Sequence, residues 1–590
     1  MASEVAKYSV YDPRIVQTQP KYAVEKGALS ISNVSFTSQT ADLSSVQFNV
    51  QVPSENVFVD RAVRWTGTQV ATIILTSSSV ANLPAGTDLS GLVGPAAFPL
   101  HQSTSQMSAT INDATVTVNT KDVLPQILRL ADLSKSRSER TCPTMLDRYS
   151  QYPDSRVVKN TSLLTWDQTK ASDEVPNAGF EGWSYCAADG TLLADGDVVG
   201  LCTYHKGVPT LTAALPTATA VTFYVRWTST EMLVLPPFIF SDQDELSTGL
   251  FGVQNFQIQM NMAPTPVRSL RASLNTTFVD VAGTFGTFTA GVPAWVSPST
   301  YGMFLGQPTL SVQFLTPALD IPLPPKSIVP WMEFPRYITS QAGAVASSNV
   351  LSTAGAVSLT SQTITLPNIP DLLVIYAKPS SYLVTDCDYV LPVSKISINF
   401  DNFSGLLSNH TQEELYKMSV DNGVDMDFSE WAGQGRVPLS VSTTGAGTTY
   451  RGGVLGLCGG PLVLRPGRDF ALSSGQAPGL VGNFTLQFNL TVKNGTGATI
   501  NPDIFVVPIS SGFFETIKGS SRIIKGVLTE QDILGAPPTA PSSEMDRMVG
   551  DGRHHGGAMG GRHHGGAMGG RHHGGAMGGR HHGGAMKAYM

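Results

Sequence analysis

The residues whose type and spacing best suit a chemical role lie in a repeated C-terminal tail. Four copies of the unit Arg-His-His-Gly-Gly-Ala-Met-Gly-Gly, the last one truncated, hold eight of the eleven histidines of this 590-residue chain. Arginines that recur every nine residues on a glycine-rich segment can contact phosphate groups without a fixed shape. We therefore predict non-specific contact with nucleic acid through Arg553, Arg562, Arg571 and Arg580. An inert, solubilising extension is the alternative interpretation of these residues.

The sequence does not predict a native metal site. The histidine pairs of the tail could ligate zinc, copper or nickel, but ligands on a flexible chain must all be ordered when the metal binds. Two acidic pairs in the body, Asp386 with Asp388 and Asp425 with Asp427, lack the glycine and the terminal glutamate of an EF-hand loop. We interpret both pairs as solvated turns.

Cys458 is the one candidate nucleophile. The run Gly456-Leu457-Cys458-Gly459-Gly460 has the outline of a nucleophile elbow, which requires a strand-to-helix turn and a nearby histidine base. The residues from Pro461 onward instead predict a strand, and only three histidines lie outside the tail. A phosphate-binding Gly-X-X-X-X-Gly-Lys-Ser/Thr loop is also missing from the sequence. We therefore predict a packed cysteine, no catalytic residue and no cofactor, with a Cys-dependent hydrolase as the enzyme alternative.

The composition indicates a folded, turn-rich chain. Charged residues make up 14% of it and hydrophobic residues 41%, with 57 glycines and 38 prolines, and no run approaches the roughly 20 apolar residues that cross a bilayer. The N-terminus lacks a basic start followed by an apolar run, so we expect a soluble protein made in the cytosol. The formal net charge is −7, of which residues 551–590 contribute about +4, leaving about −11 for the body. The five cysteines are expected to be reduced and mostly buried, and they are Cys142, Cys186, Cys202, Cys387 and Cys458.

Alternation of apolar and polar residues is the dominant pattern along the chain. It is clearest in three segments, which are residues 46–52, 256–262 and 484–492. Such alternation predicts half-buried strands. Only two short helices are predicted, one starting at Asp122 and one after Thr411, which can form a capping box with Glu414. Strands separated by glycine, proline and asparagine clusters favour an antiparallel, all-β fold.

The chain also echoes itself, which suggests two related β modules. Ser45-Val46-Gln47-Phe48 recurs as Ser311-Val312-Gln313-Phe314, and Thr110-Ile111-Asn112-Asp113 is similar to Ser397-Ile398-Asn399-Phe400-Asp401. A joint is predicted at Ala263-Pro264-Thr265-Pro266. The charge-free stretch 340–362 is interpreted as a long exposed loop. The resulting division is an N-terminal arm at 1–26, modules at 27–264 and 265–536, and a flexible tail at 537–590.

Several strings resemble the motifs of one protein family. In the first half, Phe98-Pro99-Leu100-His101, Ser108-Ala109-Thr110-Ile111-Asn112-Asp113 and Asp122-Val123-Leu124-Pro125 resemble the double jelly-roll major capsid proteins of polinton-like viruses, virophages and related DNA viruses. The second half is similar to that family's motifs in the same order, in the short helix that ends before Trp431 and in Glu333-Phe334-Pro335-Arg336-Tyr337, Asn399-Phe400-Asp401-Asn402-Phe403-Ser404-Gly405-Leu406-Leu407-Ser408, Arg465-Pro466-Gly467-Arg468-Asp469-Phe470 and Ser510-Ser511-Gly512-Phe513-Phe514-Glu515. The resemblance spans roughly residues 30 to 535. The tail and the length of the 340–362 stretch depart from the family.

The resemblance implies two tandem eight-stranded jelly rolls with a few short loop helices and a disordered C-terminal tail. It further implies a major capsid protein of the virion, assembled as homotrimeric, pseudo-hexagonal capsomers that tile an icosahedral shell. The implied partners are neighbouring capsomers, penton and minor capsid proteins, and packaged DNA contacted by the tail, with no membrane span. A secreted or surface β-sandwich that binds glycans or adheres to cells is the alternative, although it should carry a secretion signal and clustered exposed aromatic residues.

Overall fold

The computed structural model describes residues 28–525, except for 55, 78–84, 87–88, 90–91, 131–139, 149–180, 206, 217, 239–248, 273–277, 280–284, 287, 318–325, 342, 347–355, 445–446 and 495–498. The predicted N-terminal arm, the predicted tail and the four tail arginines lie outside these residues. The described chain is mostly β-strand with a few short helices, as the all-β prediction requires. None of its helices is both long enough and apolar enough to cross a bilayer.

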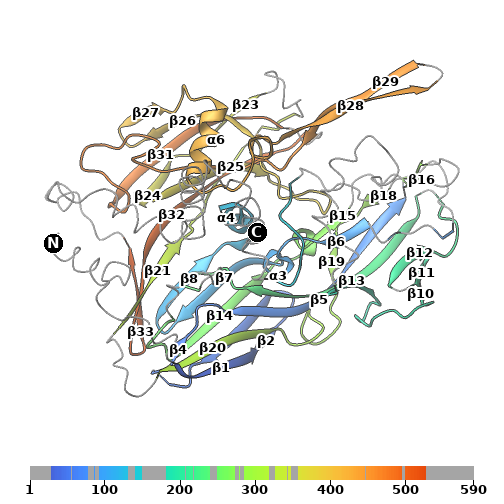
Figure 1. Ribbon diagram of the computed structural model, residues 1–590, viewed down its shortest axis with the longest axis horizontal. Coiled ribbons are helices and arrows are strands. Elements are labelled where there is room, and N and C mark those ends of the chain that lie inside the picture. The colour runs from blue at the N-terminus through green and yellow to red at the C-terminus, as the bar shows by residue number, and fades with distance from the viewer. Residues whose placement is uncertain are drawn as a thin grey trace, which may run out of the picture. The chain divides into compact units, whose positions relative to one another are not determined.

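The first half of the chain contains two large antiparallel sheets (Figure 1). One sheet contains β1 (Ala28–Thr37), β20 (Thr309–Pro317), β5 (Arg64–Ser77), β13 (Ala220–Met232) and β9 (Trp183–Cys186) in that order, with β4 (Phe58–Val59), β18 (Phe288–Ala290) and β19 (Ala294–Trp295) paired along it. The other runs in the order β2 (Thr40–Ala41), β3 (Ser45–Gln51), β14 (Asn255–Met262), β7 (Thr104–Ile111) and β8 (Ala114–Val118). Smaller sheets join β6 (Val93–Pro95) to β15 (Leu270–Ala272), β16 (Phe278–Val279) to β17 (Phe285–Gly286), and β10 (Val198–Val199), β11 (Cys202–His205) and β12 (Val208–Leu211) to one another.

The second half repeats this plan. One sheet contains β21 (Ser327–Glu333), β32 (Pro502–Ile517), β25 (Leu372–Pro379) and β30 (Leu462–Leu464), with β22 (Tyr337–Ser340) and β33 (Ser520–Lys525) also paired to β32. The other contains β23 (Val357–Thr360), β24 (Ile364–Asn368), β31 (Val481–Val492), β26 (Val393–Phe400) and β27 (Phe403–Leu406). A separate hairpin consists of β28 (Gln434–Thr444) and β29 (Gly447–Gly456). The helical segments are α3 (Pro99–Gln102), α4 (Thr120–Ile127), η2 (Leu128–Leu130), η5 (Pro266–Arg268), α6 (Gln412–Asp421) and α7 (Phe428–Trp431).

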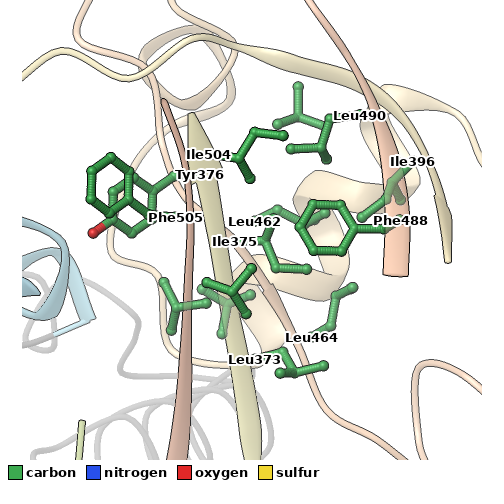
Figure 2. Packing of buried hydrophobic residues seen from close by; sticks show 14 of the residues in the cluster. Leu373, Ile375, Tyr376, Ile396, Leu462, Leu464, Phe488, Leu490, Ile504 and Phe505 are labelled. Atoms are coloured by element: carbon green, nitrogen blue, oxygen red, sulfur yellow. The ribbon is translucent and has the colours of Figure 1, made fainter. Parts of the chain in front are cut away.

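Each half buries a core between its two sheets because successive side chains of a strand point to opposite faces. In β31, the buried residues Leu486, Phe488 and Leu490 alternate with residues of the other face, of which Thr485 and Asn489 are exposed. The buried residues meet side chains of β25, β30 and β32 (Figure 2). The same alternation holds in β3 and β14. All three strand predictions are therefore confirmed, and the five cysteines are free and buried, as expected.

The two predicted helices are present. Thr411 caps α6, and Glu414 completes the capping box by accepting a hydrogen bond from the Thr411 backbone N–H at 2.8 Å. The other helix, α4, begins at Thr120 rather than Asp122. The predicted start at Asp122 is therefore two residues late, and Pro125 lies inside the helix.

One of the two sequence echoes corresponds to a structural repeat. Asn112 and Asp401 both have φ of 52° and begin the tight turns between β7 and β8 and between β26 and β27. Beside these hairpins lie β14 and β31, which pair with β7 and β26 respectively. The other echo does not mark equivalent strands of two modules, so that interpretation is wrong. Its two copies lie in β3 and β20, which both belong to the first half but lie in different sheets.

Strand pairing continues across the predicted joint at 264/265. The later strand β20 pairs along β1 and also with β5, so residues up to Pro317 complete the first-half sheet. Part of the stretch 340–362 is also ordered, because β23 pairs with β31 and Val345 is buried beside Ile500. That stretch is therefore not one continuous exposed loop.

We expect Phe488→Ala to lower the free energy of unfolding by about 3–5 kcal/mol, because the truncated side chain leaves a cavity in a core that cannot fully collapse. Chemical denaturation of the unassembled chain measures this value. Asn489→Ala, one residue further along β31 on the exposed face, is the control and should change it by less than about 0.5 kcal/mol. Equal losses in both variants would contradict the assignment of faces.

Candidate functional site

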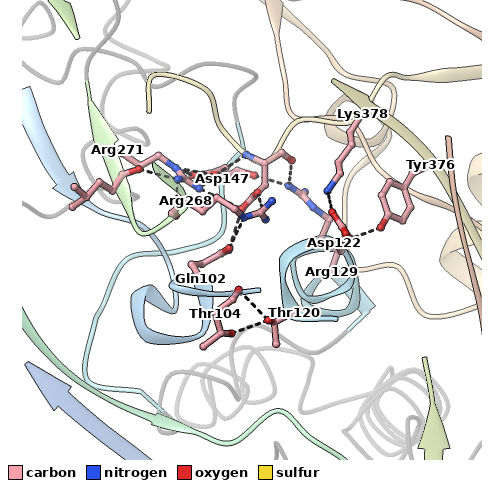
Figure 3. Close-up of polar contacts among 12 residues, drawn as sticks. Gln102, Thr104, Thr120, Asp122, Arg129, Asp147, Arg268, Arg271, Tyr376 and Lys378 are labelled. Carbon is pink, nitrogen blue, oxygen red and sulfur yellow. Dashed lines mark hydrogen bonds and ion pairs between the residues drawn. The ribbon is translucent and has the colours of Figure 1, made fainter. Parts of the chain in front are cut away.

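A buried ionic cluster joins the two halves of the chain (Figure 3). The guanidinium of Arg271 donates to the carboxylate of Asp147, with 2.6 Å between Nη2 and Oδ2, and its Nη2 lies 3.3 Å from Oδ2 of Asp388. Arg268 donates to the other oxygen of Asp388 at 3.1 Å. Asp388 comes from the second half, whereas both arginines follow β14 in the first half. We refer to Asp122, Arg129, Asp147, Arg268, Arg271, Lys378 and Asp388 as the ionic seam.

Asp388 is held in its charged form by its neighbours. Burial raises its pKa, but Arg268, Arg271, Arg129 and Lys378 lower it further, so the pKa lies below its ordinary value of 3.8. The backbone N–H of Asp388 also donates to Asp147 at 2.8 Å. The interpretation of Asp386 and Asp388 as a solvated turn is therefore wrong for Asp388, which is 9% exposed. The sequence alone did not indicate that Asp388 is buried, because its arginine partners lie more than 110 residues away.

The other end of the ionic seam is the helix α4. Lys378 on β25 donates to Oδ1 of Asp122 at 2.9 Å, and Arg336 pairs with the same carboxylate. The hydroxyl of Tyr376 donates to the backbone oxygen of Asp122 at 2.6 Å. The neighbouring residue Val123 is buried in the core of the second half. A helix of the first half is thus anchored to the second half by both charge and packing.

Cys458 lies beside the ionic seam and has the surroundings of a structural residue. Arg129 donates to its Sγ at 3.0 Å, and burial raises the pKa of the thiol to about 12, so the reactive thiolate is not favoured. The side chain is fully buried, and the strand β30 follows it, as the sequence predicted. The ring nitrogens of His101 contact Glu231 and Val234 and not the Cys458 thiol. The elbow geometry is therefore missing at Cys458.

His101 and Glu231 form a second buried polar pair, which sequence reasoning did not identify. The Glu231 carboxylate accepts from the backbone N–H groups of Leu100 and His101 at 2.9 and 3.0 Å, and lies 2.5 Å from Nδ1 of the His101 ring. The other ring nitrogen, Nε2, accepts from the N–H of Val234 at 3.2 Å, so the ring proton is on Nδ1. Both side chains are fully buried, and the pair anchors α3 to β13. The only signal for it was the string Phe98-Pro99-Leu100-His101, whose partner lies 130 residues further on.

Asp427, from the other acidic pair, has the surroundings of an exposed turn residue. Asp427 caps α7 by accepting from the N–H of Glu430 at 2.8 Å and is largely exposed, in agreement with a solvated turn. No group of three or more histidine, cysteine or acidic side chains in the described ranges is arranged to hold a metal ion. The tail arginines Arg553, Arg562, Arg571 and Arg580 are outside those ranges. The buried ion pairs of Asp388 with Arg268 and Arg271, and of Asp122 with Lys378, instead link one half of the chain to the other.

We expect Asp388→Asn to lower the free energy of unfolding by about 3–5 kcal/mol at pH 7, because it removes the charge that faces Arg268 and Arg271 in a buried site. The lowered pKa of Asp388 also fixes the pH dependence. Its stabilisation is complete above about pH 4 and is lost as the pH falls below 3.8 through the folded-state value. Denaturant unfolding at several pH values measures both effects. Asp427→Asn should cost less than about 1 kcal/mol, and an equally small loss for Asp388→Asn would contradict this account.

Comparison with known proteins identifies relatives of both halves. The family model described as Sputnik virophage major capsid protein 1st domain matches residues 3–315, and the model described as Major capsid protein V20 C-terminal domain matches residues 334–512. The V20 capsid protein of Sputnik virophage is 24% identical over 556 residues, which cover 92% of this chain and 84% of that protein.

Two solved structures are similar along most of their length. A chain from the 3.5 Å cryo-electron microscopy structure of Sputnik virophage has a TM-score of 0.64 at 23% identity, covering 91% of this chain and 97% of the other. The mavirus major capsid protein has a TM-score of 0.61 at 14% identity, covering 86% and 93%. These structures establish the double jelly-roll fold. Since the first family model alone spans more than half of the sequence, the chain belongs to the virophage major capsid protein family.

Proposed function

We propose that three copies of this chain form a pseudo-hexagonal capsomer and that such capsomers tile an icosahedral shell. The observation that carries the proposal is the structural repeat, in which β14 with the β7–β8 hairpin corresponds to β31 with the β26–β27 hairpin. Three chains with two similar β-sandwiches each present six similar units around a threefold axis. A tile with six similar sides can meet six neighbours.

The ionic seam supports this role because a tile must hold its two halves in a fixed relation. Arg271 and Asp147 on one side and Asp388 on the other are all buried, and directional charge-assisted hydrogen bonds tolerate little rotation. Each capsomer would meet several neighbours, so individual contacts between capsomers can be weak. Penton and minor capsid proteins are the further partners that we propose, with synthesis in the host cytosol before incorporation into the virion.

We also propose a division of the chain that follows strand pairing. The first jelly roll would extend through β20 and the second would begin at β21, which moves the joint from 264/265 to between Pro317 and Ser327. An N-terminal arm precedes the first jelly roll in this division, and the arginine-repeat tail follows the second.

The two alternative functions lack supporting observations. A Cys-dependent hydrolase would need a reactive thiol, whereas the pKa of Cys458 is raised to about 12 and the side chain is buried. A glycan-binding sandwich would be expected to present clustered exposed aromatic residues, yet the large hydrophobic side chains exposed in the described part of the chain are aliphatic. A structural, non-enzymatic role agrees better with both observations.

We expect purified chain to elute as a trimer of about 188 kDa, three times 62.6 kDa, or as a larger particle. Size-exclusion chromatography with multi-angle light scattering measures the mass directly. Cys458→Ser should leave this mass unchanged, since serine can still accept the hydrogen bond from Arg129. A stable monomer across the micromolar range would contradict the capsomer proposal.

We propose that the arginines of the tail contact packaged DNA. A glycine-rich segment of 40 residues has a root-mean-square span of about 35 Å, which is long enough to reach DNA beside the folded part of the chain. Replacing Arg553, Arg562, Arg571 and Arg580 by alanine should leave the trimer mass unchanged but reduce DNA bound per particle. The matched variant with four lysines keeps the charge and should retain binding. Binding should also weaken steeply with added salt. Equal DNA content in the alanine and lysine variants would contradict a role for these charges.

A further inference from the structure

The strand β32, near the end of the described chain, contributes to both halves. The strand β32 is 16 residues long. From Pro502 to Ile509 it pairs with β25 of the second half, and from Ser510 to Thr516 it pairs with β21. The chain then turns at Lys518-Gly519 and returns as β33 along the second part of β32. We call residues 510–525 the clasp.

The clasp and β21 close the core of the first half. Val329 and Trp331 from β21 and Phe514 from β32 are buried at 0%, 5% and 0% exposure, and they belong to the same cluster as the buried residues of β3, β7 and β14. Gly512 allows this packing, because a Cβ there would lie 2.6 Å from the backbone oxygen of Ile524 and 3.2 Å from the Trp331 ring. The first-half core therefore contains three apolar side chains, Val329, Trp331 and Phe514, from residues that follow the first half in sequence.

Hydrogen bonds hold the clasp against turns of the first half. The carboxylate of Asp113 accepts from the backbone N–H of Ser521 at 2.5 Å and from the hydroxyl of Ser520 at 3.0 Å. The side-chain amide of Asn112 donates to the Ser521 hydroxyl at 2.9 Å. These two residues form the β7–β8 turn, so the clasp is anchored to the edge hairpin of the first half.

A second set of contacts anchors the clasp to the loop before β14. The hydroxyl of Thr516 donates to the backbone oxygen of Phe251, and the N–H of Gly519 donates to that of Gly252 at 2.8 Å. Gly252 has φ of 78°, and a Cβ there would lie 2.8 Å from the Lys518 nitrogen. The two loops therefore approach as closely as their backbones permit, which only glycine allows at this position.

We propose that the clasp couples the folding of the first half to completion of the second. Because β32 is one continuous strand, the pairing of Pro502–Ile509 with β25 directs Phe514, five residues further on, toward the first-half core. The first half would therefore close last, although it is synthesised first, and an incomplete chain would leave its core open to water. This coupling acts within one chain and does not depend on whether three copies assemble.

Pulse-labelled hydrogen–deuterium exchange during refolding of the full chain tests the order of closure. In the wild type, amides of β3 and β14 should gain protection no earlier than those of β25 and of residues 502–509. Earlier protection of β3 and β14 would overturn the proposal. Such a measurement on unassembled chain is separate from the mass measurement that tests the capsomer.

Exchange in the folded chain tests the coupling itself. Phe514→Ala should speed exchange in β3 and β14 at least tenfold and leave β26 and β31 unchanged, whereas the matched core variant Phe488→Ala should speed exchange in β26 and β31. If Phe514→Ala affects only β21 and β33, the clasp merely rests on the first half and the proposal fails.

If the Phe514→Ala chain does not fold, a pair of less disruptive variants tests the same coupling. Asp113→Ala removes the acceptor for Ser520 and Ser521, and Asp401→Ala changes the corresponding turn of the second half. Only Asp113→Ala should speed exchange in β33 and β8. Equal effects of the two variants on the first half would also overturn the proposal.

Discussion

The two cores of this protein are not closed by their own halves, and the rest of the structure depends on that constraint. The strand β32 belongs to a sheet of the second half and then supplies Phe514 to the first-half core. In the opposite direction, α4 follows β8 of the first half and buries Val123 in the second-half core. Because each half lacks apolar surface that only the other provides, separating the two would expose buried side chains on both sides.

The ionic seam adds direction to this exchange of elements. Burying charges is costly, so the pairing of Asp388 with Arg268 and Arg271 adds less net stability than apolar packing of the same volume would. It does impose geometry, since the carboxylate must lie between two guanidinium groups from the other half. Apolar contacts from α4 and β32 hold the halves together, and the ionic seam fixes how they are oriented. Both effects suit a protein whose role in a shell is to keep its shape.

The same arrangement accounts for the surroundings of Cys458 and His101. Cys458 and His101 are each satisfied by buried partners, Arg129 and Glu231, that hold elements in place. Membership of the virophage major capsid protein family agrees with a structural role for these buried polar residues. The repeat of two similar sandwiches is the property on which the proposed capsomer rests.

Local features were determined by the sequence alone. The alternation in β31 and the capping box of Thr411 with Glu414 depend on residues a few positions apart, so they could be predicted, and the motif strings indicated the family. The pairing of β20 with β1, the burial of Asp388 and the pairing of Asp113 with the clasp could not, because the partners lie from 117 to 408 residues away and the composition near each residue does not indicate them. Tertiary structure decided these features, since burial and charge pairing depend on which distant strands come to lie side by side.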